Sequence, residues 1–375
     1  MVKKIYLDYQ STTPVSKKVL EKMMPFFREK FANPHSNNHS FGRETNEAVE
    51  NSRSQVANLI NAEPNEIIFT SGATESNNLA IKSIAQNYFD DDFQVITVKT
   101  EHKCVLESCL YLEEQKNKVH FLDVNEDGLI DLNSLEALIK YKPSLISIMH
   151  ANNEIGVLQP LMKIGELCKK YNAIFHSDIA QSISTAALDV KSLNLHAASI
   201  SGHKIYGPKG IGALYLSKSI KNIVRPLIDG GGQEMGIRSG TLSPALCVGL
   251  GESCEDLSKN LKKYVNHFKK LKSIILSKLI DSDINFEING DPNIRIPNNL
   301  NIRIKNKEAL VLFNKMPHIA MSTGSACTSG TITRSHVLTA LKLNDQQIDE
   351  SFRISFGRET SSNDIEELIS QLKKN

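Results

Sequence analysis

Short apolar segments that alternate with helical ones constrain the fold of this chain more than any other feature. EIIFT, QVITV, SLISIM, AIFHS, ASISG and IGALYL lie between residues 66 and 216, and helical or loop segments separate them, beginning with a predicted helix over 43–60. Strands that are apolar along their whole length are typical of a parallel sheet covered by helices on both faces. The pattern therefore predicts an α/β fold with a mostly parallel sheet.

The character of the sequence changes after about residue 250. A lysine-rich helix is predicted over about 252–281, followed by a strand pair that includes NNLNIRI, by the strand FRISFG, and by a helix that begins near Ser361 or Ser362. The lysines are typical of a solvated helix face, and an acidic protein partner is the alternative. We predict a large domain over 15–255 and a smaller α+β domain formed by 1–14 and 256–375.

Composition excludes several classes of protein. The chain has 375 residues, of which 40% are apolar and 23% charged, as in ordinary globular proteins. A net charge of +2 gives no general field for nucleic acid, so no direct nucleic-acid partner is expected. The start, MVKKIYLDYQ, lacks the apolar core of a signal peptide, and no segment is predicted to span a membrane. We predict a cytoplasmic protein.

The six cysteines separate into two kinds. None forms a C-x-x-C pair, which argues against a zinc site or a redox dithiol, and free thiols are expected. Five of them have neighbours that indicate packing. Cys327 instead lies in MSTGSACTSG, where Gly, Ala, Ser and Thr cannot bury it. We predict a mobile loop that carries an accessible thiol.

A lysine and an aspartate follow two of the predicted strands. SISGHKIYGPKG places Lys204 between an apolar strand and glycine-rich turns, where partial desolvation would lower its pKa and favour Schiff-base chemistry. Asp178 ends the strand AIFHS, and ligands of open α/β sheets bind at the carboxyl ends of strands. Pyridoxal phosphate requires this pair, because lysine forms the imine and the acid keeps the pyridine nitrogen protonated. The alternative is two unrelated polar strand ends.

Other segments suggest anion and substrate contacts. TSGATESNN joins a strand to a helix, and the start of such a helix can bind phosphate. DGGGQEMGIRSGT could bring Thr241 to a second anion contact. His102, after QVITV, could lie over an aromatic cofactor or be structural. Arg353 faces away from Phe352 and Ile354, and it suits either a substrate carboxylate or a structural salt bridge.

Taken together, these motifs resemble one family. LDYQSTTP, FTSGATESNNLAI, TEHK, MHANNEIGV, HSDIAQS, SGHKIYGPKGIGALY, GGGQEMGIRSGT, GSACTS and RISFGR follow the order of the cysteine desulfurases of the IscS/NifS type, pyridoxal-phosphate enzymes of the class V aminotransferase family. The resemblance runs from about residue 5 to about residue 360, and GSACTS is similar to the long-loop subgroup. It implies fold type I of the pyridoxal-phosphate transferases, with a seven-stranded type of sheet and a small domain that carries the Cys327 loop.

Carried over position by position, the resemblance implies a role for each site residue. Lys204 would be the Schiff-base lysine, Asp178 the partner of the pyridine nitrogen, and Cys327 the nucleophile. His102 would stack on the cofactor ring and take part in catalysis, and Arg353 would hold the substrate carboxylate. The resemblance further implies Gln181 at the phenolic oxygen, Ala73, Thr74, Ser201 and His203 at the phosphate, Gly202 among the cofactor contacts, Asn153 at cofactor and substrate, and Thr241 from the other subunit of a homodimer.

The implied reaction converts L-cysteine to L-alanine and retains the sulfur on Cys327 as a persulfide. The substrate amine would replace Lys204 in the imine, and Lys204 would then remove the Cα proton. Attack by Cys327 on the substrate sulfur needs a thiolate and a loop that can move. No metal site is implied, apart from transient ligation of an Fe–S cluster by Cys327.

Departures from the family pattern bear on the partner more than on the chemistry. HSDIAQS replaces the common HVDATQS, Met235 replaces a frequent arginine, and Ser11 replaces a common alanine, without a change of chemical role. Cys104, near His102, is expected to pack. The sequence ends at Asn375, without the longer tail by which housekeeping IscS proteins dock their Fe–S scaffold. The sulfur acceptor therefore stays open between an Fe–S scaffold and enzymes that thiolate tRNA, DNA or a cofactor.

Two other functions remain to be compared with the desulfurase. Another fold-type I aminotransferase would use Lys204 and Asp178 but would leave Cys327 without a task. A catalytically idle sulfur-relay scaffold would need neither, and the presence of both Lys204 and Cys327 argues against it.

Overall fold

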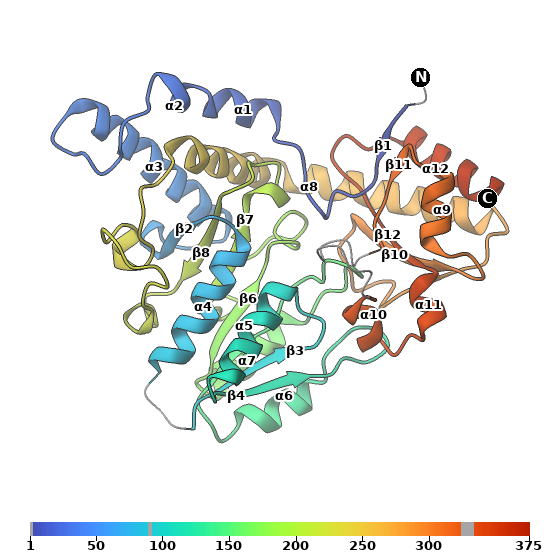
Figure 1. The fold of residues 1–375 in the computed structure, drawn as a ribbon, viewed down its shortest axis with the longest axis horizontal. Coiled ribbons are helices and arrows are strands. Elements are labelled where there is room, and N and C mark those ends of the chain that lie inside the picture. Colours follow the sequence, from blue (N-terminus) through green and yellow to red (C-terminus); the bar gives the residue numbers. More distant parts are fainter. Residues whose placement is uncertain (1–2, 89–91, 324–333) are drawn as a thin grey trace.

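The computed structural model describes residues 3–88, 92–323 and 334–375, which form a large and a small sheet with helices around both (Figure 1). The large sheet has the strand order β2-β8-β7-β6-β5-β3-β4. In that order its strands are Ile67–Thr70, Gly212–Leu216, Ala197–Ser201, Ile174–Asp178, Ser144–Ser147, Gln94–Val98 and Lys118–Leu122. All neighbours are parallel except β8, which is antiparallel to both β2 and β7. The mixed α/β fold with a mainly parallel sheet is confirmed.

The direction of β8 determines which strand ends lie at the same edge of the sheet. Because β8 runs opposite to β2 and to β7, these two strands point the same way as β3, β4, β5 and β6. Thr70 at the end of β2 and Ser201 at the end of β7 both pair with Gly212. A side chain at Gly212 would come within 2.6 Å of the Cα atom of Gly72, so glycine is needed for this close approach. The carboxyl ends of six strands therefore share one edge of the sheet.

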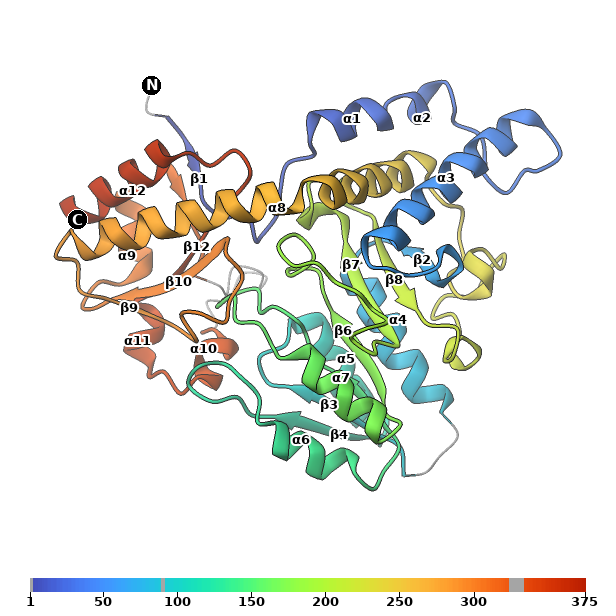
Figure 2. The same ribbon diagram turned by 180° about the vertical axis from the view of Figure 1, so that it is seen from behind.

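Helices cover the large sheet on both faces. On one face α4 (Ala73–Asn87) and α5 (Lys103–Glu114) pack against a core that includes Ile68, Val95 and Leu145. On the other, α3 (Ser40–Leu59), α6 (Leu132–Ile139) and α7 (Leu161–Lys170) pack against a core with Phe69 and Ile146. Figures 1 and 2 show the two faces from opposite sides. Successive strand residues point to opposite faces, which explains why these strands are apolar throughout.

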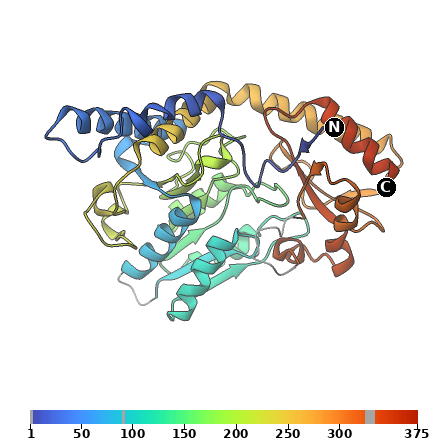
Figure 3. The same cartoon turned by 45° about the horizontal axis from the view of Figure 1, so that its top comes forward.

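A single long helix passes along both sheets (Figure 3). Helix α8 (Pro244–Ile280) begins with a proline, a residue favoured at the first helical position, rather than near residue 252 as predicted. Near its start it contacts α1 (Lys17–Met23), α2 (Pro25–Arg28) and α3, and it also contacts α12. A side chain at Gly251 would lie 2.7 Å from Ser52, so this glycine allows α8 and α3 to approach closely.

The small sheet has its own core. Strands β9 (Phe286–Ile288), β10 (Asn299–Ile304) and β12 (Ser351–Ser355) are antiparallel in the order β12-β10-β9, and β1 (Ile5–Tyr6) pairs in parallel with β11 (Ile319–Ala320). Residues Ile5 and Leu7 pack with the second half of α8. The remaining helices here are α9 (Ala309–Lys315), α10 (His336–Ala340), α11 (Asp345–Asp349) and α12 (Ser362–Lys374). The proposed domain boundaries stay a prediction.

The described residues also include four 3-10 turns: η1 (Pro64–Glu66), η2 (Gly202–Lys204), η3 (Lys221–Ile223) and η4 (Glu234–Gly236). Strand β1, near the start of the chain, and the C-terminus lie beside the small sheet (Figure 1). In the part of the chain that the structure describes, no helix has the length and apolar character needed to cross a membrane.

Candidate functional site

A cavity of about 530 Å³ lies at the carboxyl edge of the large sheet, where residues of the small sheet also reach it. Most of the predicted site residues line this one cavity, although they are distributed over most of the sequence. They are Ala73, Thr74, His102, Asn153, Asp178, Gln181, Ser201, His203, Lys204 and Arg353. Chain topology brings them together, because all but Arg353 end or follow strands whose carboxyl ends lie at the same edge of the large sheet. Arg353 lies on β12 of the small sheet, opposite this edge.

Two predicted residues do not line the cavity, and a third lies outside the described residues. Gly202 lies between Ser201 and His203 but is not itself among the lining residues. Thr241 is exposed, between η4 and α8, and does not line the cavity described for this chain. Cys327 lies outside the described residues. Ser322, five positions earlier in the sequence, does line the cavity.

The lysine and the aspartate are each held by neighbouring groups. Lys204 lies in η2 directly after β7, and its Nζ donates to the backbone oxygens of Gln10 and Ser11 at 2.5 and 2.8 Å. Asp178 ends β6 and is 6% exposed. Its Oδ1 accepts from the backbone N–H of Ala180 at 2.9 Å, and its Oδ2 accepts from Asn77 Nδ2 at 2.7 Å. The carboxylate therefore has a fixed orientation at the cavity wall.

His102 is the N-cap of α5, since its Nδ1 accepts from the backbone N–H of Cys104 at 3.2 Å. Burial lowers the pKa of His102, and the nearby charge of Asp178 opposes this by raising it. Cys104 also lines the cavity, and burial raises the pKa of its thiol to about 12. At neutral pH the ring is therefore uncharged and the thiol keeps its proton.

The start of α4 forms an anion cradle at one end of the cavity. Ser71, Gly72, Ala73 and Thr74 all line it, and Gly72 adopts a φ of 152°, which side chains rarely allow. The first N–H groups of a helix have no partner within the helix, and the helix dipole favours a negative charge there. Such a cradle suits a phosphate group.

Arg353 approaches the cavity from the small sheet. It is 3% exposed, and Phe352 and Ile354 on either side of it point into the opposite core, as predicted. Its guanidinium donates to the backbone oxygen of Asn153 at 2.6 Å, to Asp8 Oδ1 at 2.6 Å and to Ser11 Oγ at 2.7 Å. Within the described residues, Arg353 Nε and Asn153 Oδ1 are buried without a hydrogen-bond partner.

Several lining residues were given no role by the sequence alone. They are Gln10, Ser11, Thr12, Met149 and Lys209, and Cys104 was expected only to pack. The polar run QSTT, which begins at Gln10 shortly after the first strand, was the available signal for three of them. Gln10 is 2% exposed and connects both sheets, since its backbone oxygen binds Lys204 and its side-chain oxygen accepts from Asn299 at 2.5 Å.

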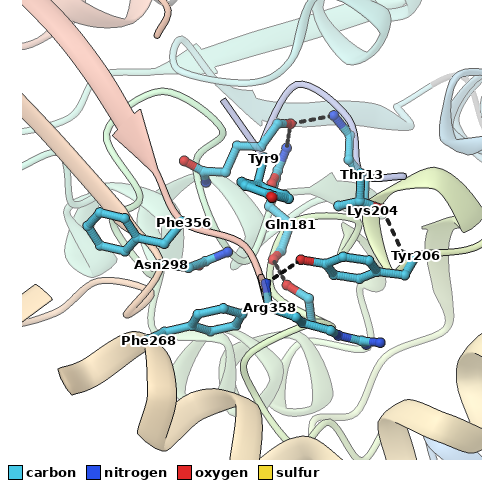
Figure 4. A pocket seen from close by; sticks show the side chains of 11 residues that line it. Tyr9, Thr13, Gln181, Lys204, Tyr206, Phe268, Asn298, Phe356 and Arg358 are labelled. Atoms are coloured by element: carbon cyan, nitrogen blue, oxygen red, sulfur yellow. Dashed lines mark hydrogen bonds between the residues drawn. The ribbon is translucent and has the colours of Figure 1, made fainter. Parts of the chain in front are cut away.

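A second cavity of about 10 Å³, the size of one water molecule, adjoins the first (Figure 4). The two cavities share Gln10, Gln181 and Lys204. Figure 4 also shows Arg358, whose backbone N–H donates to the hydroxyl of Tyr206 at 2.6 Å. The Cζ atom of Arg358 lies 4.1 Å from the ring centroid of Tyr206 and 3.9 Å from that of Tyr264. This side chain therefore connects the small sheet to the site region and to α8.

Comparison with known proteins agrees with this arrangement. The family model of aminotransferase class V matches residues 5–368. The chain is 46% identical to the cysteine desulfurase IscS of Rickettsia africae over 362 residues, which cover 96% of this chain and 88% of that protein. Among solved structures, a NifS-like protein matches with a TM-score of 0.92 and 34% identity, over 99% of this chain and 98% of that chain.

SspA in complex with cysteine matches with a TM-score of 0.85 and 37% identity, over 94% of this chain and 98% of that chain. The family model covers nearly the whole chain, and the identities extend over the same length. The chain therefore belongs to the aminotransferase class V family, alongside the cysteine desulfurases of the IscS and NifS type.

Proposed function

We propose that the protein is a cysteine desulfurase that uses pyridoxal phosphate, converts L-cysteine to L-alanine and transfers the sulfur to Cys327 as a persulfide. The observation that carries the proposal is the convergence of Lys204, Asp178, His102 and Arg353 on one cavity. Ser322, close in sequence to Cys327, lines the same cavity. The 46% identity to a desulfurase named IscS and the likeness to SspA, solved with cysteine, support the same assignment.

The residues present fit pyridoxal phosphate. The cradle at the start of α4, with Ser201 and His203 beside it, suits the phosphate. Lys204 would hold the cofactor covalently, and Asp178, fixed by Asn77 and Ala180, would hold a proton on the pyridine nitrogen. When bound there, the cofactor supplies an electron sink for negative charge on the substrate Cα.

Arg353 and Asn153 would hold the carboxylate of the substrate. Asp8 and Ser11 orient the guanidinium, and Arg353 Nε, buried without a partner among the described residues, is a donor that a carboxylate oxygen could satisfy. Leaving a buried donor unsatisfied costs about 1–3 kcal/mol, so a bound carboxylate would recover this energy. An amino-acid substrate is therefore favoured over one without a carboxylate.

The remaining steps belong to Lys204, His102 and Cys327. Lys204 would take the proton from the substrate Cα, and His102 would take part in the proton transfers that follow. The thiolate of Cys327 would attack the substrate sulfur. The S–S bond forms as the Cβ–S bond breaks, the bonding electrons return to carbon, and protonation of that carbon yields alanine.

We propose a homodimer on the basis of an exposed apolar surface. Leu20, Met24, Phe27, Phe31 and Phe41, from the segment that contains α1, α2 and the start of α3, are between 47% and 69% exposed. This segment projects from one end of the molecule (Figure 3). Exposed apolar side chains in such number are typical of an interface. A second copy placed there would allow Thr241 of one subunit to reach the phosphate cradle of the other.

The sulfur acceptor is proposed by class. It would be a protein that docks near the segment containing Cys327, either a scaffold for Fe–S cluster assembly or an enzyme that thiolates tRNA, DNA or a cofactor. A persulfide must be handed to a second nucleophile, so such a partner is a chemical requirement of the proposed reaction. Capture with a persulfide-trapping reagent and identification of the bound protein would distinguish the two.

Incubation of the purified protein with L-cysteine and a reductant tests the function. We expect a yellow protein that releases alanine and sulfide. Cys327→Ser should stay yellow but lose sulfide release, since holding the cofactor needs only Lys204, whereas Lys204→Ala should lose both products. Cys168→Ala, a change at a buried cysteine in α7 away from the cavity, is the control and should behave as wild type. A colourless protein, or full sulfide release by Cys327→Ser, would contradict the proposal.

A further inference from the structure

Asn77 connects the aspartate of the site to a cysteine. Asn77 lies on α4 and is completely buried. Its Nδ2 donates to Asp178 Oδ2 at 2.7 Å and to Cys104 Sγ at 3.1 Å, and its Oδ1 has no partner among the described residues. The reversed amide would place an oxygen against the carboxylate of Asp178, so the repulsion fixes the NH₂ group on this side. An amide nitrogen accepts no hydrogen bond, and the proton of Cys104 must therefore point elsewhere.

The acceptor for that proton is His102. The backbone N–H of Cys104 donates to His102 Nδ1 at 3.2 Å, and a backbone N–H can only donate. Nδ1 therefore carries the lone pair, and the neutral ring holds its proton on Nε2. The side-chain sulfur of Cys104 lies 3.0 Å from the same Nδ1. Since Nδ1 has no proton to give, the sulfur is the donor of this contact.

The surrounding charges agree with this assignment. Burial lowers the pKa of His102, Asp178 raises it, and Lys204, His336 and Lys103 lower it, which leaves the ring neutral. Burial raises the pKa of Cys104 to about 12, Asp178 acts in the same direction, and the thiol is therefore present rather than the thiolate. The hydrogen bonds from the side chains of Asn77 and Thr74 lower this pKa, as bonds donated to the sulfur do, so neither of them takes the proton of Cys104. A protonated sulfur beside an unprotonated ring nitrogen is the combination that the hydrogen bond requires.

We propose that Cys104 is a positioning residue for His102: its S–H donates to Nδ1 and holds the ring as the tautomer with the proton on Nε2. Asn77 then donates to both Asp178 and Cys104, and Cys104 donates to His102, so the four residues form one hydrogen-bonded network at the cavity wall. The inference deepens the proposed desulfurase function and rests on it, because it assigns the atom, Nε2, on which His102 holds the proton for transfer. Cys104 is thus more than a packed thiol.

Infrared spectroscopy of the full-length protein tests the hydrogen bond directly. The S–H stretch falls in a region free of other protein bands, and subtraction of the Cys104→Ser spectrum isolates the Cys104 band. We expect this band at a lower wavenumber than that of a free thiol, and a rise in His102→Leu. Cys109→Ala, which removes another buried thiol from α5, is the matched control and should leave the band in place. Absence of a Cys104 S–H band, or a band indifferent to His102→Leu, would overturn the proposal.

Kinetics distinguish positioning from packing. Cys104→Ser retains a donor and should keep kcat near wild type, whereas Cys104→Ala should lower kcat by about fivefold, the effect of one neutral hydrogen bond. KM for cysteine should change little. The limb of the pH profile that reports His102 should move to higher pH in Cys104→Ala, because loss of a donor to the neutral ring makes protonation easier. Equal behaviour of the two variants would refute the assignment.

The two proposals fail in different ways. If wild type releases no alanine from cysteine, the desulfurase function falls, while the infrared band still reports whether Cys104 donates to His102. If alanine and sulfide are released but the band is indifferent to His102, only the positioning role falls.

Discussion

At the scale of single residues, the histidines His176 and His102 differ in role: the first has structural partners only, and the second lines the main cavity. His176 is completely buried on β6, two positions before Asp178. Its Nδ1 and Nε2 lie 2.9 and 3.0 Å from the hydroxyls of Ser147 and Ser199 on the neighbouring strands. Both ring nitrogens are thus occupied by structural partners. His102 differs because it lines the cavity and has Cys104, a titratable group, at its Nδ1.

The buried state of His176 predicts a pH dependence of stability. Burial lowers its pKa from 6.5 to about 3. Between these values the unfolded chain binds a proton that the folded protein does not, so stability is lost as pH falls from 6.5 toward 3, by about 1.4 kcal/mol for each pH unit. We expect His176→Gln to weaken this dependence, seen as a smaller drop of the urea midpoint over the same pH range.

The exposed His35 supplies the matched control for this measurement. His35→Gln should leave the pH dependence of the urea midpoint as in wild type. An unchanged dependence in His176→Gln, with native structure retained, would show that His176 is not the group that titrates.

At the scale of elements, sequence patterns located most strands but missed β4. QVITV was predicted as a strand and β3 spans those same residues, because every one of them is buried. Strand β4 gave no apolar signal, since it lies at the sheet edge and only Leu122 of its five residues is buried. NNLNIRI was predicted as a strand, and β10 confirms it; the polar residues Asn299 and Asn301 of this strand are fully buried.

The polar face of β10 is a contact between the two sheets. Asn299 Nδ2 donates to Gln10 Oε1 at 2.5 Å and to the backbone oxygen of Glu154 at 3.0 Å, and Asn301 donates to the same oxygen of Glu154 at 3.2 Å. These bonds hold the N-terminal segment and the loop after β5 against the small sheet. Gln10 and Asn153, on these two segments, both line the main cavity.

Asn299→Asp should disturb both stability and the site. The change replaces a donor by an oxygen that faces two acceptors, and a buried group left unsatisfied costs about 1–3 kcal/mol. We expect a lower urea midpoint and faster loss of bound cofactor on dilution, followed by its absorbance. Asn285→Asp, at an exposed position before β9, is the control. If the two variants behave alike, the polar face of β10 does not support the site.

At the scale of the whole molecule, the proposed dimer depends on the apolar surface of the α1–α2 segment. Phe31 is 69% exposed there. Phe31→Asp places a charge in the proposed interface and should shift the subunits toward monomer, measured by sedimentation at several concentrations. Cofactor retention should fall with it, because Thr241 of the partner would be lost from the phosphate site.

Tyr141→Asp is the matched control, since Tyr141 is an 80% exposed aromatic residue after α6, away from this segment. It should leave the association unchanged. Equal association of Phe31→Asp and wild type would exclude this surface as the interface.

The sequence alone determined which chemical groups are present and on which kind of fold. Alternating apolar strands and helices predicted the α/β sheet, and the order of the motifs predicted the family, because both are properties of neighbours along the chain. Lys204 and Asp178 were recognisable as strand ends for the same reason.

Only the tertiary structure decided which groups meet. The antiparallel strand β8 brings the ends of β2 and β7 to one edge, and the N-terminal segment places Gln10 and Ser11 on Lys204 and Arg353. The Asn77–Cys104–His102 chain likewise joins α4 to α5. Such contacts join residues far apart in sequence, so they depend on strand order and packing, which local pattern does not encode.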